Sequence, residues 1–181
     1  SMKEQGTLVG DTLVTTVMSN MGLRKAMEEH NITVLETAVG DRYVLEELER
    51  TGARLGGEQS GHVILTDHST TGDGILTGLQ LAKEVLRTGR TLADLADQIE
   101  IFPQVLRNVP GVDRSALADN HVVQSAIGDA SRELGDSGRV MVRASGTEAL
   151  IRVMVEASDQ ATAERIADQV ADVISVELVL P

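Results

Sequence analysis

The alternation of strand-like and helix-like segments in the first hundred residues constrains the fold most strongly. The run DTLVTTVM (11–18) reads as a buried strand, and GLRKAMEEHN (22–31) reads as a helix that leads to a second β-rich run, ITVLETAV (32–39). Strands that alternate with helices are typical of layered α/β domains rather than of sandwiches or bundles. The first part of the chain is therefore predicted to be an α/β layer domain.

Capping residues predict two further helices in this domain. Asp41 is placed to cap a helix that ends at Gly52, and Asp73 is placed to cap a helix over 74–89. In the second helix, five apolar residues fall on one face: Ile75, Leu76, Leu79, Ala82 and Leu86.

A run with two prolines, IEIFPQVLRNVP (99–110), interrupts the helical pattern. Because proline disfavours helix at the residue before it, the run reads as an extended segment and as the best domain boundary. We place the domains at 1–100 and 101–181. The second domain is predicted to have an α+β order: a strand through Val109, a helix over 119–134, two strands joined by a turn, and a helix over 161–176.

The charge balance and composition exclude several classes of protein. The chain has 28 acidic and 16 basic residues, a net charge of −12, so its overall field repels nucleic acids and anionic membranes. One Tyr, one Phe and no Trp leave few platforms on which single-stranded bases could stack. Cysteine is absent, and no apolar run resembles a signal peptide or membrane segment. We expect a cytoplasmic protein that binds neither nucleic acid nor membrane, in which any anion site is local.

Two arginines bracket a polar turn between two predicted strands in RASGTEALIRVMVEA (143–157). The hydroxyls can donate hydrogen bonds, the glycine lets backbone amides converge, and both guanidinium forks can approach one point. These properties suit a phosphate site, and its candidate ligands are Arg143, Ser145, Gly146, Thr147 and Arg152. The alternative is a polar hairpin whose arginines are solvated or paired with Glu148 and Glu156.

A second candidate motif is GGEQSGH (56–62), in a segment that reads as strand, turn and strand. A carboxylate, a hydroxyl and an imidazole recur here at a spacing of two, in Glu58, Ser60 and His62. In an extended segment these side chains would point to one side. A carboxylate can accept hydrogen bonds from neighbouring sugar hydroxyls or pair with a sugar ammonium, and flanking glycines let a ring approach the backbone. A glycine-rich hairpin with exposed polar residues is the alternative.

The two motifs, in this order and about eighty residues apart, resemble the α-D-phosphohexomutase superfamily. The segments AVGDRYV and TGDGILTGLQL also resemble segments of that family, so the likeness covers nearly the whole chain. The form of the second motif with glutamine, GEQSGH with Gln59, most closely resembles the motif of the branch that acts on glucosamine phosphates. One departure is Ala149, which stands where the family usually has proline.

The resemblance implies a role for each loop. GGEQSGH resembles the sugar-binding loop, so that Glu58 and Ser60 would contact substrate hydroxyls, with His62 beside them in the active cleft. RASGTEALIRVMVE resembles the phosphate-binding loop, whose contacts to the nonreacting phosphate carry over to Arg143, Ser145, Gly146, Thr147 and Arg152.

The family's phosphoserine loop, with a Ser-His-Asn-Pro core, and its Asp-x-Asp-x-Asp-Arg metal loop occur nowhere in the sequence. The resemblance thus implies a carboxyl-terminal fragment, with most of domain 3 (α/β, incomplete at its start) and domain 4 (α+β). Its partners would be domains 1 and 2 of the same enzyme and a sugar phosphate. The full-length enzyme would use Mg²⁺, with no metal ligand and no catalytic residue in this chain. It would interconvert glucosamine 6-phosphate and glucosamine 1-phosphate through a phosphoserine and a bisphosphate intermediate.

Several other residues carry weaker signals. Asp41 and Arg42 stand where the family has a third substrate-facing loop, but a helix cap accounts for Asp41 and is the preferred interpretation. The histidines outside the motif have no partners at zinc-ligand spacing and are expected to be scattered on the surface: His30, His68 and His121.

Two alternatives to this function stay open. A sibling mutase acting on mannose or glucose phosphates would differ only by small loop substitutions. A noncatalytic sugar-phosphate-binding module would use the same two loops without turnover.

Overall fold

A computed structural model describes residues 1–180, so only the last residue of the predicted second domain lies outside the description. The chain divides into two compact units, Ser1–Ile101 and Phe102–Pro181. The boundary proposed from the sequence follows residue 100, and the division in the structure follows Ile101. Within residues 1–180 no helix has the length and apolar character needed to cross a membrane.

The first unit contains a four-stranded sheet in the order β2-β1-β3-β4. Its strands are β1 (Thr12–Thr16), β2 (Thr33–Thr37), β3 (Leu55–Gly57) and β4 (Val63–Leu65). β1 pairs in parallel with β2 and β3, and β4 pairs antiparallel with β3. Strands were predicted in each of these segments, and the parallel centre of the sheet fits the alternation of strands and helices.

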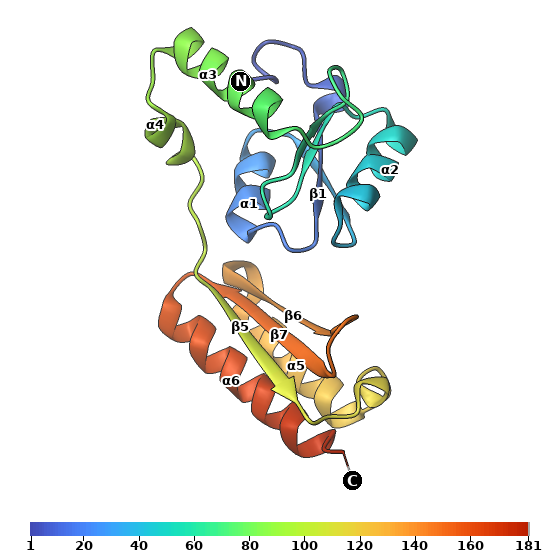
Figure 1. Cartoon of the computed structure of the whole chain (residues 1–181). Coiled ribbons are helices and arrows are strands. Elements are labelled where there is room, and N and C mark those ends of the chain that lie inside the picture. The colour runs from blue at the N-terminus through green and yellow to red at the C-terminus, as the bar shows by residue number, and fades with distance from the viewer. Residues whose placement is uncertain (181) are drawn as a thin grey trace. The chain divides into compact units, whose positions relative to one another are not determined.

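The helical elements of this unit are η1 (Val9–Asp11), α1 (Met21–Glu29), α2 (Asp41–Thr51), α3 (Gly74–Thr88) and α4 (Leu92–Ala96). α1 leads from β1 to its neighbour on one side, and α2 leads back to β3 on the other side of β1. Right-handed crossovers in opposite directions place the two helices on opposite faces of the sheet, as Figure 1 shows.

The core of the first unit lies between α2 and the sheet, and consists of Val14, Val44, Leu48, Ala53 and Ile64. Gly56 on β3 is part of this contact, because an added Cβ would lie 2.6 Å from Cγ1 of Val44. Only a glycine lets α2 approach β3 so closely. The packing therefore fixes the strand that leads directly into the motif at 58–62.

The predicted cap of α2 by Asp41 is wrong. The residue that precedes the helix is Gly40, with φ 135°, and Asp41 is the first helical residue. The carboxylate of Asp41 accepts only from the amide of the next residue, Arg42, at 2.8 Å. The chain turns into the helix through a backbone conformation that residues with a side chain rarely adopt, so the glycine takes the capping position. The predicted end of the helix at Gly52 is confirmed by its left-handed conformation.

The predicted cap of α3 by Asp73 is confirmed, since its carboxylate accepts from the amides of Ile75 and Leu76. The apolar face predicted for this helix exists but is not buried: Ile75 is 80%, Leu79 65% and Leu86 84% exposed. No residue of α3 is buried among the residues that the structure describes. Amphipathic spacing thus identified the helix correctly, but the described residues do not bury its apolar face.

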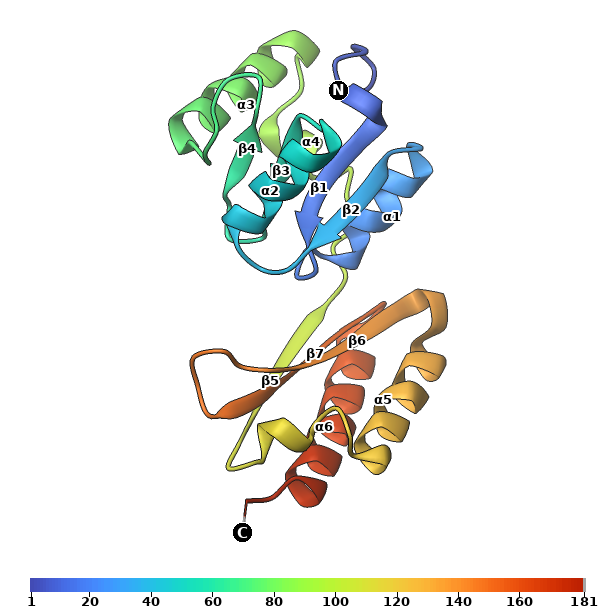
Figure 2. The same cartoon turned by 90° about the vertical axis from the view of Figure 1, so that its right-hand side faces the viewer.

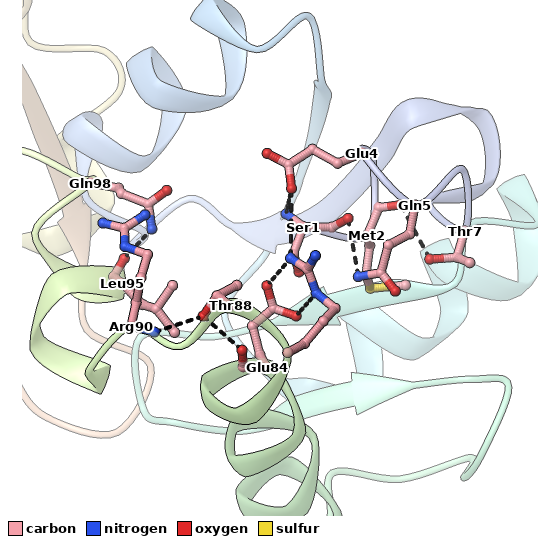
Figure 3. A network of polar contacts seen from close by, with 11 residues as sticks. Ser1, Met2, Glu4, Gln5, Thr7, Glu84, Thr88, Arg90, Leu95 and Gln98 are labelled. Carbon is pink, nitrogen blue, oxygen red and sulfur yellow. Dashed lines mark hydrogen bonds and ion pairs between the residues drawn. The ribbon is translucent and has the colours of Figure 1, made fainter.

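The first residues of the chain lie beside the carboxyl-terminal half of α3 (Figure 3). Glu84 accepts hydrogen bonds from Arg87 at 2.6 and 2.9 Å. This interaction, with a smaller contribution from Ser1, lowers the pKa of Glu84 to about 2. The carboxylate therefore stays ionised, and paired with Arg87, at more acidic pH than an ordinary glutamate does.

The second unit contains a three-stranded antiparallel sheet in the order β5-β7-β6. Its elements are β5 (Gln104–Pro110), η2 (Arg114–Ala116), α5 (His121–Leu134), η3 (Gly135–Ser137), β6 (Gly138–Ala144), β7 (Leu150–Ala157) and α6 (Gln160–Glu177). Both long helices cover one face of the sheet (Figure 2). This arrangement confirms the predicted α+β fold.

The two faces of the second sheet have different environments. Toward the helices, Ile151, Val153 and Val155 of β7 are fully buried. The alternate residues of β7 point to the other face, where Arg152 lies and where Glu156 pairs with Arg139 of β6 at 2.6 Å. The arginines of the candidate phosphate motif therefore belong to the face that the helices leave open.

Candidate functional site

The turn of residues 145–149 joins β6 to β7 and carries most of the predicted phosphate ligands. The amide of Ser145 donates to the carbonyl of Leu150 at 3.0 Å, and the amide of Glu148 donates to the hydroxyl of Ser145 at 3.3 Å. Ser145 is only 3% exposed, whereas Gly146 and Thr147 are exposed. Ser145 thus forms the inner wall of the turn, and the next two residues form its outer rim.

Several donors of this turn have no acceptor. The amides of Gly146, Thr147 and Ala149 make no hydrogen bond within residues 1–180, and neither does the Thr147 hydroxyl. Neighbouring backbone amides without acceptors form a partial positive charge that suits an anion. The turn therefore has the donor set of a phosphate site.

Arg143 and Arg152 lie directly opposite each other where β6 and β7 enter the turn. Arg152 pairs with the carboxylate of Glu148, but its buried Nε has no hydrogen-bond partner among the described residues. The guanidinium of Arg143 makes no hydrogen bond or ion pair with any of residues 1–180. Of the alternative pairings considered from the sequence, Glu148 does pair with an arginine of the motif, whereas Glu156 pairs with Arg139.

Sequence reasoning missed one residue at this turn, Arg114 of η2. Its Nη1 donates to the carbonyl oxygens of Ser145 at 2.6 Å and Glu148 at 2.8 Å. Arg114 precedes Ser145 by 31 positions, and no local pattern connects the two. Only the tertiary structure brings them together.

The sugar-motif side chains converge, but not in the way predicted. Residues 58–62 form a closed turn rather than an extended segment, since the amide of Glu58 donates to the carbonyl of His62 at 2.9 Å. Within the turn, the Ser60 hydroxyl lies 3.2 Å from Oε1 of Glu58 and 3.1 Å from Nδ1 of His62, and that nitrogen lies 3.1 Å from the same Oε1. The three groups therefore meet because the turn closes, and not because they share one side of an extended strand as predicted.

This cluster suits binding better than nucleophilic attack. In a catalytic triad, the serine and the carboxylate contact opposite nitrogens of the histidine ring. Here both Ser60 and Glu58 contact Nδ1 of His62, so no relay runs through the ring. A carboxylate, a hydroxyl and an imidazole at one point instead offer several donors and acceptors to a polyhydroxyl ligand.

Glu58 also connects this turn to the start of α2. Its Oε2 accepts from the amide of Gly40 at 3.1 Å, and its side chain is only 9% exposed. Because Asp41 follows Gly40 directly, this hydrogen bond keeps Asp41 near the turn. The side chain of Arg42 is 80% exposed and forms an ion pair with Glu46. The hydrogen bond with Glu46 raises the pKa of Arg42.

A metal site has no support among the residues that the structure describes. Among residues 1–180, no group of three or more His, Asp or Glu side chains is arranged to hold a metal ion. Asp73 is occupied as a helix cap. Mg²⁺ takes several oxygen ligands around one point, so the residues present do not fit it.

Comparison with known proteins gives matches over nearly the whole chain. Residues 1–102 match the phosphoglucomutase/phosphomannomutase alpha/beta/alpha domain III, and residues 106–173 match the C-terminal domain of the same family. A phosphoglucosamine mutase of Clavibacter sepedonicus is 56% identical over 99% of this chain and 40% of its own length. One of Leifsonia xyli subsp. xyli (strain CTCB07) is 57% identical over 98% of this chain and 39% of its own length. The chain thus spans about two fifths of these relatives.

Solved structures with the same fold include an N-acetylphosphoglucosamine mutase of Aspergillus fumigatus in complex with GlcNAc-6P and magnesium. It superposes with a TM-score of 0.81 over 98% of this chain and 41% of its own length, at 18% sequence identity. At this identity the likeness concerns the fold alone.

Proposed function

The chain belongs to the phosphoglucomutase/phosphomannomutase family, and from this we propose that it supplies the sugar-binding and phosphate-binding loops of a phosphoglucosamine mutase. The longer enzyme would interconvert glucosamine 6-phosphate and glucosamine 1-phosphate. The observation that carries the proposal is the turn at 145–149, whose free amides lie beside two opposed arginines. Such a site binds a dianion through charge-assisted hydrogen bonds.

The phosphate loop would hold the phosphate that does not react. The ligands we propose are those named from the sequence: Arg143, Ser145, Gly146, Thr147 and Arg152. The buried and unpaired Nε of Arg152 supports its inclusion, because a buried donor without an acceptor costs free energy that a bound anion would recover. The Ser145 hydroxyl already accepts the Glu148 amide, so its proton is available to a phosphate oxygen.

The turn at 58–62 would hold the sugar. Glu58 and Ser60 would bond neighbouring hydroxyls, and His62 would orient the carboxylate through its Nδ1 contact. The hydrogen bond from Gly40 to Glu58 makes the start of α2 a second wall of this site, which supports Asp41 and Arg42 as a third substrate-facing loop. Hexose choice would rest mainly on Gln59.

Binding loops of this kind suit a reaction in which the substrate binds in two orientations. In a phosphohexomutase the phosphoryl group moves between a serine and either of two sugar oxygens. A loop that holds hydroxyls, and another that holds a nonreacting phosphate, each recognise a feature common to both orientations. This chain would bind and orient the substrate, while the reacting serine lies elsewhere.

The remaining machinery would come from amino-terminal domains of the same enzyme. We propose that these domains hold the phosphoserine and Mg²⁺, which offsets charge on the moving phosphoryl group. The chain spans about two fifths of its relatives' length, which leaves room for such domains. The reaction uses soluble sugar phosphates, and we place the enzyme in the cytoplasm.

The test is turnover by the longer protein that contains this chain. Conversion of glucosamine 6-phosphate would be compared with that of mannose 6-phosphate and glucose 6-phosphate under the same conditions. We expect kcat/KM to be highest for glucosamine 6-phosphate. A preference for either neutral sugar would instead identify a sibling mutase.

A further inference from the structure

We propose that Arg114 is a positioning residue, which holds the turn at 145–149 in the shape that binds phosphate. The inference rests on the proposed function of that turn. Arg114 lies in η2, outside both strands that carry the turn, and it donates to two of the turn's carbonyl oxygens.

The turn has little internal support without Arg114. Its backbone is held by a 3.0 Å bond that closes the strand ends, a short-range bond from Leu150 to Glu148 at 3.0 Å, and a long bond of 3.3 Å to the Ser145 hydroxyl. One side-chain pair, that of Glu148 with Arg152, adds to these bonds. Arg114 adds bonds of 2.6 and 2.8 Å, both from a charged donor. Charge-assisted bonds are about twice as strong as neutral ones. The two bonds from Arg114 are therefore the shortest to the backbone of the turn.

These two bonds also determine which way the turn's amides point. In a trans peptide unit, the carbonyl and the following N–H point in opposite directions. Because the Ser145 carbonyl faces Arg114, the Gly146 amide faces away from it, and the same holds for the Glu148 carbonyl and the Ala149 amide. Both of these amides lack an acceptor among the described residues. Arg114 thus binds carbonyl oxygens that would repel an anion and leaves the amides available to it.

The backbone around Arg114 is well anchored. The amide of Asp113 donates to the carbonyl of Leu178 at 2.7 Å, and Val112 forms a bridge with Val179 and is 5% exposed. The Asp113 carboxylate accepts from the Ser115 hydroxyl at 2.6 Å and amide at 2.9 Å, which lowers the pKa of Asp113. The guanidinium therefore extends from a fixed base, as a positioning role requires.

The experiment uses the whole 181-residue chain and three variants: Arg114→Gln, Arg114→Lys and, as a matched control, Arg132→Gln. Arg132 is an exposed arginine of α5 that bonds Asp129. Amide NMR would first measure the order of residues 145–149 without ligand. Titration with inorganic phosphate would then give the dissociation constant.

Arg114→Gln should loosen residues 145–149 before phosphate is added and raise the dissociation constant about tenfold, the cost of roughly one charge-assisted hydrogen bond. Arg114→Lys should restore most of both, because an ammonium can donate to two carbonyl oxygens. Arg132→Gln should change neither.

Two results would overturn the inference and leave the proposed function intact. One is an unchanged phosphate affinity in Arg114→Gln while Arg143→Ala loses binding. The other is a loss of affinity in Arg114→Gln without any change in the unliganded turn, which would make Arg114 a direct ligand. If phosphate perturbed no amide of the turn in the unsubstituted chain, the proposed function itself would fail and this inference with it.

Discussion

Arg143 on β6 and Arg152 on β7 face each other directly across an antiparallel pair of strands. Like charges in directly opposite positions are destabilising. Glu148 neutralises only one of the two, through its pair with Arg152, and Arg143 has no partner within residues 1–180. The arrangement costs stability in the free chain, and an anion bound between the arginines, as we propose, would relieve it.

In the proposed phosphate site, Glu148 would compete with phosphate for Arg152. Glu148→Gln removes the competing charge, and we expect it to lower the dissociation constant for inorganic phosphate about two- to fivefold, consistent with the strength of an exposed ion pair. Isothermal titration calorimetry at low and high salt would measure the change. Glu133→Gln is the matched control, since it removes the same charge and an exposed pair with Arg165 on other helices. A weaker affinity in Glu148→Gln would show that the carboxylate organises the site instead.

Glu58 is expected to act on the sugar and not on the phosphate. Glu58→Gln and Glu58→Ala should both leave inorganic phosphate binding unchanged and both lower turnover of glucosamine 6-phosphate in the longer enzyme. They should differ at Gly40, whose amide keeps an acceptor in the glutamine variant and loses it in the alanine variant. Hydrogen exchange at Gly40 would measure this difference. Turnover equal to that of the unsubstituted enzyme would count against the assigned role.

The buried pair of Glu156 and Arg139 is expected to dominate the polar contribution to stability in the second unit. The side chain of Glu156 is 0% exposed and that of Arg139 is 14% exposed. Arg139→Leu removes the arginine partner of a buried carboxylate and should lower the free energy of unfolding by about 3–5 kcal/mol. Arg107→Leu, which breaks an exposed pair with Asp168, should cost at most about 1 kcal/mol. Urea unfolding followed at residues of this unit would compare them, and equal losses would refute the distinction.

The chain alone is expected to show no mutase activity, even with Mg²⁺ and a bisphosphate activator. Phosphoryl transfer requires a nucleophile that can be phosphorylated and a cation near the moving group. Ser60 lacks the relay of a triad, Ser145 is held in the wall of the turn, and the described residues offer no metal cluster. A coupled assay for glucosamine 1-phosphate would check this. Activity that follows the chain through purification and disappears in Arg143→Ala would contradict it.

The sequence was sufficient where the signal is local. The strands at 12–16 and 150–157 and the cap at Asp73 depend on alternation or on neighbours two or three positions away. The α/β and α+β folds of the two units followed from the order of such segments. Both candidate motifs could also be read from the sequence, because their residues lie within a few positions of each other, and their roles in binding stay predictions.

The sequence did not predict features that depend on the backbone conformation of single residues or on contacts between residues far apart in the chain. The capping residue of α2 is Gly40 rather than the predicted Asp41, because the chain enters the helix with a positive φ. The residues of the sugar motif meet through a closed turn, which strand alternation does not predict. Arg114 was missed because its partners lie 31 and 34 positions away. The exposure of the apolar face of α3 could not be predicted, because helical spacing shows which residues share a face but not what covers it.

The central claim is that the turn at 145–149 binds the phosphate of a sugar phosphate, and amide NMR of the chain titrated with glucosamine 6-phosphate tests it most directly. We predict shifts at Gly146 and Thr147, and an affinity that falls about 10- to 150-fold in Arg143→Ala, the cost of one charge-assisted hydrogen bond. Arg132→Ala should bind as the unsubstituted chain does. Shifts confined to residues outside 143–152, or an affinity unchanged in Arg143→Ala, would contradict the claim.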